Sequence, residues 1–170
     1  SLLFVRTMCA RFCDDRVEAF LLGVALGDAT GAPYEFHQHQ GRLGKYTGKL
    51  EEWGRATRWQ GWLRFSTGSV TDDTEMTIAC LRTVVEGYTK ERAVANYHEW
   101  ASTNPRGIGR NTKAIFQGYK KPEFYAKRIA KVFDTEEKKE AAQSNGCLMR
   151  AAPLALLDDP MIPEIDCSIT

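Results

Sequence analysis

The chain has 170 residues, of which 43% are apolar and 26% charged, a composition typical of globular proteins. Its 23 Lys and Arg nearly balance its 22 Asp and Glu, so the formal charge of +1 gives no reason to expect nucleic acid or an anionic membrane as a partner. No apolar run is long enough to span a bilayer, and the length suits a single domain over residues 1–170.

Helical periodicity begins at about residues 16–30, where apolar side chains recur at three- and four-residue spacing. The apolar stripe of this predicted helix consists of Val17, Phe20, Leu21, Val24 and Ala25. Asp28 falls on the same stripe, one turn beyond Val24. A carboxylate in that position needs a cation or hydrogen-bond donors, because a lone buried charge is very costly.

Residues 36–70 show neither a helical nor a strand period and contain six glycines and three tryptophans. A stretch of this length without regular structure is usually functional or disordered, and the tryptophans argue against disorder. We therefore predict an ordered, irregular loop with a functional role.

Further helical patterns follow at about residues 72–88, 90–102, 111–119 and 122–133. The apolar face of the first of these is predicted to consist of Met76, Cys80, Leu81, Val84, Val85 and Tyr88. A last apolar run covers residues 148–157, with Pro153 as a kink or an N-terminal residue. Because no convincing alternating pattern appears, the predicted fold class is all-α.

Residues that could bind soft metal ions are few and poorly spaced. The cysteines are odd in number and form no CxxC pair, which argues against a disulfide framework and a zinc site. We predict reduced thiols, as in a cytoplasmic protein, at Cys9, Cys13, Cys80, Cys147 and Cys167. His37 and His39 lack a third ligand at a suitable spacing and are predicted to be solvated.

Two adjacent carboxylates and a hydroxyl, in Thr71, Asp72 and Asp73, stand at the start of the 72–88 helix. Local sequence alone favours helix capping, since Asp72 and Glu75 have the spacing of a capping box. The alternative is a site for a hard cation such as Mg²⁺, which takes oxygen ligands. Three side chains cannot fill an octahedron, so this alternative needs ligands from elsewhere in the molecule.

Two further segments combine small and polar residues at a helix end. In the segment 27–35, which contains Asp28 and Glu35, small residues at the helix end would let another backbone or a ligand approach closely. The alternative is a tight helix terminus with a surface glutamate. The second segment consists of Ser144, Asn145, Gly146, Cys147, Leu148, Met149 and Arg150. Flexible backbone before a helix can bind an anion such as phosphate, although a simple helix cap is the common alternative.

Taken together and in this order, GVALGDATGAPYEF, TDDTEM and SNGCLMRAAPL resemble the ADP-ribosylglycohydrolase family, and the likeness spreads over about residues 16–157. The Gly-rich segment 106–112, with Gly107 and Gly109, resembles one found in the family between the last two motifs. The resemblance implies an orthogonal all-α bundle around two Mg²⁺ ions, with ADP-ribose or an ADP-ribosylated protein as the partner. The implied activity is Mg²⁺-dependent hydrolysis of the glycosidic bond between ADP-ribose and a protein side chain.

The resemblance also implies roles for individual residues. Thr71, Asp72 and Asp73 match metal ligands of the family, and Glu35 matches an acidic residue with a catalytic or gating role. Asp28 matches a position that supports the catalytic site. Residues 144–150 match the segment that surrounds the diphosphate of ADP-ribose, and Gly107 and Gly109 are grouped with them as substrate-binding residues.

One departure from the family concerns the remaining metal ligands, which the family takes from a C-terminal D-x-D-T motif absent from this sequence. We therefore expect a family domain that is truncated at its C-terminus. It would be a fragment, a chain whose partner supplies the missing ligands, or an inactive relative with a structural or ADP-ribose-binding role. An unrelated Mg²⁺ phosphohydrolase is a further alternative.

Overall fold

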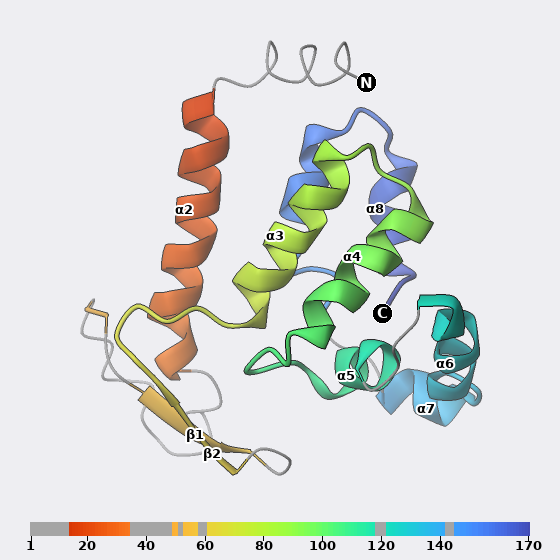
Figure 1. Ribbon diagram of the computed structural model, residues 1–170, viewed down its shortest axis with the longest axis horizontal. Helices are drawn as coiled ribbons and strands as arrows, with labels where there is room; N and C mark the ends of the chain where they lie inside the picture. The colour runs from red at the N-terminus through yellow and green to blue at the C-terminus, as the bar shows by residue number, and fades with distance from the viewer. Residues whose placement is uncertain (1–13, 35–48, 51–52, 58–60, 118–121, 142–144) are drawn as a thin grey trace. The chain divides into compact units, whose positions relative to one another are not determined.

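The computed structural model describes residues 14–34, 49–50, 53–57, 61–117, 122–141 and 145–170 (Figure 1). The chain divides into two compact units, residues 1–71 and 72–170. Helices dominate the described residues, which confirms the all-α fold class, with one small two-stranded sheet as an addition. The single domain over residues 1–170 stays a prediction.

The first unit contains the long helix α2 (Asp14–Gly31), which confirms the first predicted helix. The short 3₁₀ helix Ala32–Tyr34 follows it, and Ala32 and Pro33 are buried. The predicted apolar stripe is half-buried along α2, whereas Leu22 and Leu26 on another face are 62% and 58% exposed. The periodicity therefore identified the covered face of this helix correctly.

A β-hairpin occupies part of the region that the sequence predicted to be irregular. Strands β1 (Trp53–Thr57) and β2 (Gly61–Phe65) pair antiparallel, with Trp53 opposite Phe65 and Thr57 opposite Gly61. The strands have only five residues each, and each includes a glycine, which weakens the strand signal in the sequence. The prediction of irregular structure was wrong for these ten residues.

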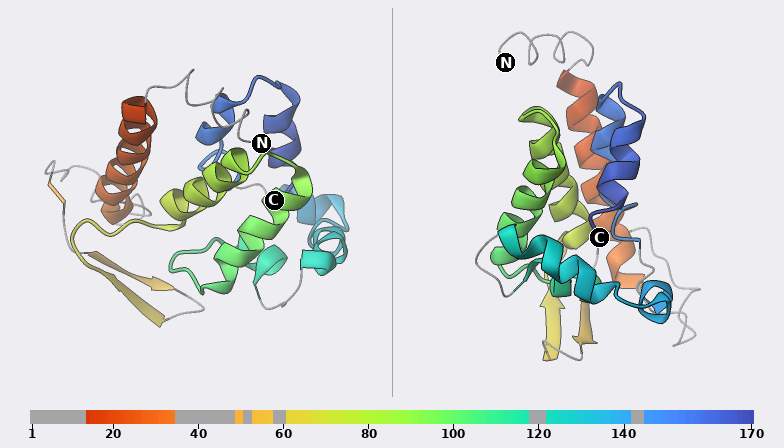
Figure 2. Two further views of the ribbon diagram at one scale, coloured as in Figure 1. Left: turned by 45° about the horizontal axis from the view of Figure 1, so that its top comes forward. Right: turned by 90° about the vertical axis from the view of Figure 1, so that its right-hand side faces the viewer.

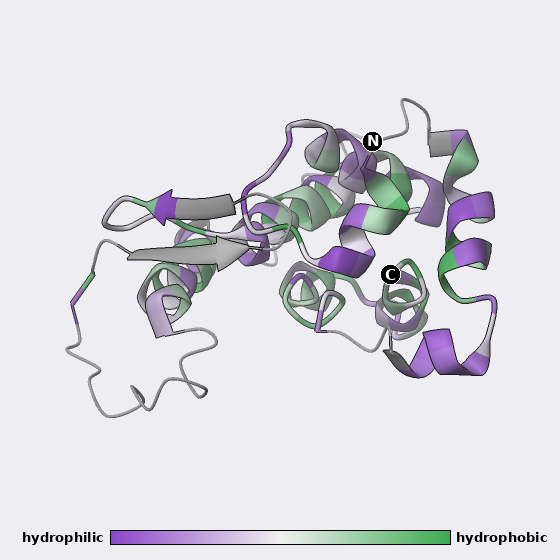
Figure 3. Cartoon of the chain, turned by 90° about the horizontal axis from the view of Figure 1, so that it is seen from below, coloured by the Kyte–Doolittle hydropathy of each residue, from purple (hydrophilic) through white to green (hydrophobic). Residues whose placement is uncertain are grey.

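The second unit is built from helices and 3₁₀ helices (Figures 1 and 2). In chain order they are α3 (Asp72–Val85), α4 (Lys90–Ser102), α5 (Arg110–Phe116), the 3₁₀ helix Pro122–Phe124, α6 (Tyr125–Val132), α7 (Glu136–Ala141), the 3₁₀ helix Ala152–Leu156 and α8 (Met161–Cys167). The helices predicted at 72–88, 90–102, 111–119 and 122–133 are confirmed within a few residues. Helix α7 was not predicted, and Figure 3 shows it as strongly hydrophilic, which explains why no apolar period marks it.

Helices α3 and α4 lie side by side and supply most of the core of this unit (Figures 1 and 2). Their fully buried side chains include Met76, Cys80, Val84, Ala93, Tyr97 and Ala101. Gly87 has φ +86, a conformation that favours glycine, and it ends the turn after α3. Thr89 then caps α4 by accepting a hydrogen bond from the N–H of Arg92. The predicted burial of Val85 was wrong, since this residue is 54% exposed at the end of α3.

The apolar run over residues 148–157 does not form one continuous helix, and Pro153 takes one of its two predicted places, near the start of a helix. The run forms a tight turn at 145–150 and then the short 3₁₀ helix Ala152–Leu156, in which Pro153 stands near the start. Proline lacks a backbone N–H, so it suits the first turn of a short helix better than the interior of a long one. Helix α8 follows and lies next to this segment (Figures 1 and 2). No helix in the described part of the chain has the length and apolar character needed to cross a bilayer.

Candidate functional site

Asp28 and Thr71 form a specific contact within the first unit, although 43 positions separate them in the sequence. The Thr71 backbone N–H donates to one carboxylate oxygen of Asp28 at 2.8 Å, and the Thr71 hydroxyl donates to the other, also at 2.8 Å. The need for hydrogen-bond donors at Asp28 is therefore met. Because the Thr71 hydroxyl gives its proton to Asp28, its oxygen lone pairs are oriented away from that carboxylate. Asp28 thereby positions Thr71.

Asp72 and Asp73 occupy the first turn of α3 in the second unit, where the helix dipole favours negative charge. Asp72 is only 8% exposed, and its Oδ2 accepts a hydrogen bond of 3.2 Å from the N–H of Gly109. Asp73 is half-buried. A carboxylate with so little exposure is held by the surrounding fold and does not simply extend into solvent.

The capping interpretation accounts for only part of these contacts. Thr71 and Asp72 both make side-chain hydrogen bonds to segments outside α3, to Asp28 and to Gly109. Oε2 of Glu75, the other acid of the predicted capping box, accepts a hydrogen bond of 2.8 Å from the Trp100 indole of α4. Within the second unit, the acidic start of α3 therefore contacts α4 and the Gly-rich segment in addition to any role at the helix end.

The turn at residues 145–150 packs against the same end of α3. The Thr77 hydroxyl lies 2.8 Å from the carbonyl oxygen of Asp73 and 2.9 Å from that of Met149. Thr77 is fully buried, so this contact is part of the core. Within the turn, Gly146 is buried, Cys147 and Met149 are half-buried, and Asn145 and Leu148 are exposed. The second unit thus brings three predicted segments together: Asp72 and Asp73, the Gly-rich segment at 107–109, and the turn at 145–150.

Arg150 was predicted among the substrate-binding residues, and the structure places its guanidinium in the core. Its side chain is fully buried and forms an ion pair with Asp166, with Nε 2.7 Å from Oδ2. Burial opposes the positive charge, but the Asp166 carboxylate outweighs it and holds the pKa of Arg150 above its ordinary value. The guanidinium also lies over the Tyr97 ring, 4.8 Å from its centroid. Arg150 thereby supports the turn, and its predicted role in substrate binding stays a prediction.

Asp166 is the centre of a network that sequence reasoning missed. The hydroxyls of Tyr88 and Tyr97 both donate to its Oδ1, at 2.9 and 2.7 Å. Burial is the main cause that raises the pKa of both tyrosines, so their phenols stay protonated and can donate. The sequence around Asp166 gives no signal for such a role, because the partners of Asp166 lie far away in the chain. They come from α4, from the turn between α3 and α4, and from the 145–150 turn.

The Gly-rich segment has one position that requires glycine. Gly107 has φ +90, whereas Gly109, at the start of α5, has φ −60 and ψ 149, which any residue adopts. We expect Gly107→Ala to lower the free energy of unfolding by about 1 kcal/mol or more, because a side chain is strained at that φ. Chemical denaturation of Gly107→Ala and of the unaltered protein measures this change in the free energy of unfolding.

Gly109→Ala is the matched control for that change. A Cβ at Gly109 would lie 3.8 Å from Thr112 Oγ1, an ordinary contact distance, so the effect of this substitution should be small. Equal stability of the two variants would contradict the assignment of backbone strain to Gly107.

Several predicted residues lie outside the described part of the structure, namely Glu35, Ser144, His37 and His39. Among the residues that are described, no three His, Cys, Asp or Glu side chains gather into a possible metal site. The oxygen donors of Thr71, Asp72 and Asp73 nevertheless suit Mg²⁺ in their chemistry, since this ion prefers carboxylates, hydroxyls and water. A complete site therefore needs ligands in addition to these three.

Comparison with known proteins identifies the family. Residues 10–166 match the sequence pattern of the ADP-ribosylglycohydrolases, and the chain belongs to this family. Over 144 residues it is 30% identical to the ADP-ribosyl-[dinitrogen reductase] glycohydrolase of Rhodospirillum rubrum. The aligned region covers 84% of this chain and 44% of that relative. Over 103 residues it is 32% identical to a protein of Acanthamoeba polyphaga mimivirus named as an ADP-ribosyl glycohydrolase. This second aligned region covers 58% of this chain and 30% of that relative. The chain spans less than half the length of both relatives.

Proposed function

We propose that this protein hydrolyses the glycosidic bond between ADP-ribose and a modified protein side chain, in a reaction that depends on Mg²⁺. The observation that carries the proposal is the convergence of separate segments in the second unit. Asp72 contacts Gly109, and Thr77 of the same helix contacts the 145–150 turn. Membership of the ADP-ribosylglycohydrolase family supports the reaction class.

The metal would be held by Thr71, Asp72 and Asp73, which are consecutive in the chain and supply only oxygen donors. Asp28 contributes by holding Thr71 through two hydrogen bonds of 2.8 Å, one from its backbone N–H and one from its hydroxyl. When bound, Mg²⁺ supplies polarisation of a substrate oxygen or of water. The remaining ligands would come from polypeptide beyond these residues, either of the same protein or of a partner chain, and two ions are proposed for the complete site.

The substrate would be recognised through its diphosphate. Backbone N–H groups of the segment 144–146 would bind this anion, together with the backbone around Gly107 and Gly109. The 145–150 turn is held by the buried Arg150 and by Thr77, so its backbone is preorganised for binding. Binding energy from the distant diphosphate would help to place the reacting anomeric carbon.

Glu35 is proposed to act on the water that replaces the protein side chain. Cleavage of a glycosidic bond passes through an oxocarbenium-like state, which a carboxylate can assist by accepting the proton of the attacking water. Glu35 lies seven positions after Asp28 in the chain, and Asp28 supports the site through Thr71.

The test uses the full-length product of the gene and peptides that carry ADP-ribose on arginine or on serine. We expect free ADP-ribose to appear with Mg²⁺, to stop with a chelator and to return when Mg²⁺ is restored. Chromatography of the released nucleotide measures the reaction. Release of phosphate without ADP-ribose, or no release from either peptide, would reject the proposed function.

A further inference from the structure

The guanidinium of Arg150 holds two peptide groups that lead into two cysteines. Its Nη1 donates to the carbonyl of Gly146 at 2.7 Å, and its Nη2 donates to the carbonyl of Asp166 at 2.8 Å. Gly146 directly precedes Cys147, and Asp166 directly precedes Cys167. Because both carbonyls bind neighbouring nitrogens of one planar group, the two segments are fixed next to each other at the cysteines.

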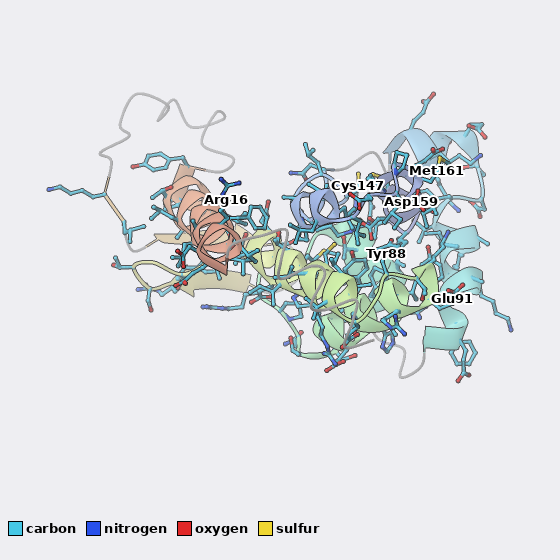
Figure 4. All side chains as sticks on the ribbon, turned by 90° about the horizontal axis from the view of Figure 1, so that it is seen from above. Arg16, Tyr88, Glu91, Cys147, Asp159 and Met161 are labelled. Atoms are coloured by element: carbon cyan, nitrogen blue, oxygen red, sulfur yellow. The ribbon has the colours of Figure 1, made fainter. Side chains whose placement is uncertain are left out.

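The two cysteines directly follow the carbonyls that Arg150 holds, so their side chains leave the backbone from neighbouring peptide groups. Partial desolvation raises the pKa of Cys167, and a hydrogen bond with the Cys147 thiol raises it further. Both cysteines are free, with Cys147 half-buried and Cys167 exposed. Figure 4 labels Cys147 on the turn. A small reagent in solution can therefore reach the pair from the Cys167 side.

We propose that Cys147 and Cys167 are a thiol pair that closes into a reversible disulfide by exchange with a small-molecule disulfide of the glutathione class. The bond would fasten the 145–150 turn to the end of α8. This inference does not depend on the hydrolase activity, because it rests on the contact between the two segments alone.

The exchange proceeds in two balanced steps. The Cys167 thiolate attacks one sulfur of the small disulfide, which forms a mixed disulfide and releases one small thiol. The Cys147 thiolate then attacks the Cys167 sulfur, which forms the internal bond and releases the second small thiol. Two cysteine thiols are oxidised, one small disulfide is reduced to two thiols, and the two cysteine protons end on the released thiols. Since the thiolate is the nucleophile and the pKa of Cys167 is raised, the exchange should accelerate towards alkaline pH.

Cys80 provides a matched control inside the same unit. It is fully buried, and burial is the main cause that raises its pKa to about 12. A thiol that stays protonated and inaccessible does not exchange, so Cys80→Ser should leave the reaction unchanged. Cys9 and Cys13 lie outside the described residues and are replaced by serine in every protein that is compared.

The experiment treats the folded full chain with oxidised glutathione and maps the disulfides by mass spectrometry of peptides under non-reducing conditions. We expect a peptide pair joined through Cys147 and Cys167, formed in higher yield than in the chain unfolded with guanidinium and reversed by dithiothreitol. Cys147→Ser should instead retain glutathione on Cys167. The internal bond closes a loop of about 20 residues, so we expect the oxidised protein to unfold about 5–10 °C higher than the reduced protein.

Three results would overturn the proposal. One is a folded chain in which both cysteines carry only glutathione, and another is a folded chain that does not react. The third is equal yields of the joined peptide in folded and unfolded chain, because the fold would then contribute nothing to the pairing.

Discussion

Replacing Asp166 with asparagine is expected to lower the free energy of unfolding by about 3–5 kcal/mol, the penalty typical for removing one member of a buried ion pair. Arg150 and Asp166 have 0% and 1% exposed side chains, so solvent cannot replace the lost charge. The Asp166 carboxylate also accepts hydrogen bonds from Tyr88 and Tyr97. Asparagine keeps the shape of the side chain but leaves the Arg150 charge without its counterion in the core.

Thermal and urea unfolding measure the effect, and a fall of about 10 °C in the midpoint is expected for a chain of this size. Glu164→Gln is the matched control, because this acid lies on the same helix and is exposed. Its effect should stay within about 0.5 kcal/mol. A stability of Asp166→Asn close to that of the unaltered protein would show that the ion pair is not a structural centre of the second unit.

Replacing Asp72 or Asp73 with asparagine is expected to reduce Mg²⁺-dependent release of ADP-ribose by about 1,000-fold or more, because the charge stabilisation supplied by a bound metal is worth several kcal/mol. Asparagine at residue 72 retains an oxygen that can accept the Gly109 N–H, so the change removes charge and spares that hydrogen bond. The full-length gene product is assayed with ADP-ribosylated peptides, and calorimetry follows Mg²⁺ binding.

Glu91→Gln is the control for these variants, because Glu91 is an exposed acid in the first turn of α4 and faces the same helix-dipole effect. We expect normal turnover from it, and circular dichroism should show that all three variants remain folded. Turnover at the normal rate in both aspartate variants would eliminate the metal role and leave helix stabilisation as their function.

The sequence alone was sufficient for the helices whose apolar residues recur along one face. Helices α2, α3 and α4 are confirmed because burial of one stripe is a local, periodic pattern. The hairpin at 53–65 and the hydrophilic α7 carry no such pattern, and they were missed. Asp28 was predicted to need a cation or hydrogen-bond donors, since its place on an apolar stripe is itself a sequence observation, and Thr71 supplies donors.

Which residues partner one another was decided only by the tertiary structure. Asp28 accepts hydrogen bonds from Thr71, Asp72 accepts one from Gly109, and Arg150 forms an ion pair with Asp166. The two residues of each pair are separated by sixteen or more positions in the sequence. A sequence indicates that a buried charge needs a partner, but many polar residues can meet that need. The choice depends on how the helices pack. This packing placed Arg150 in the core beside Asp166, where its guanidinium also holds the carbonyls that precede Cys147 and Cys167.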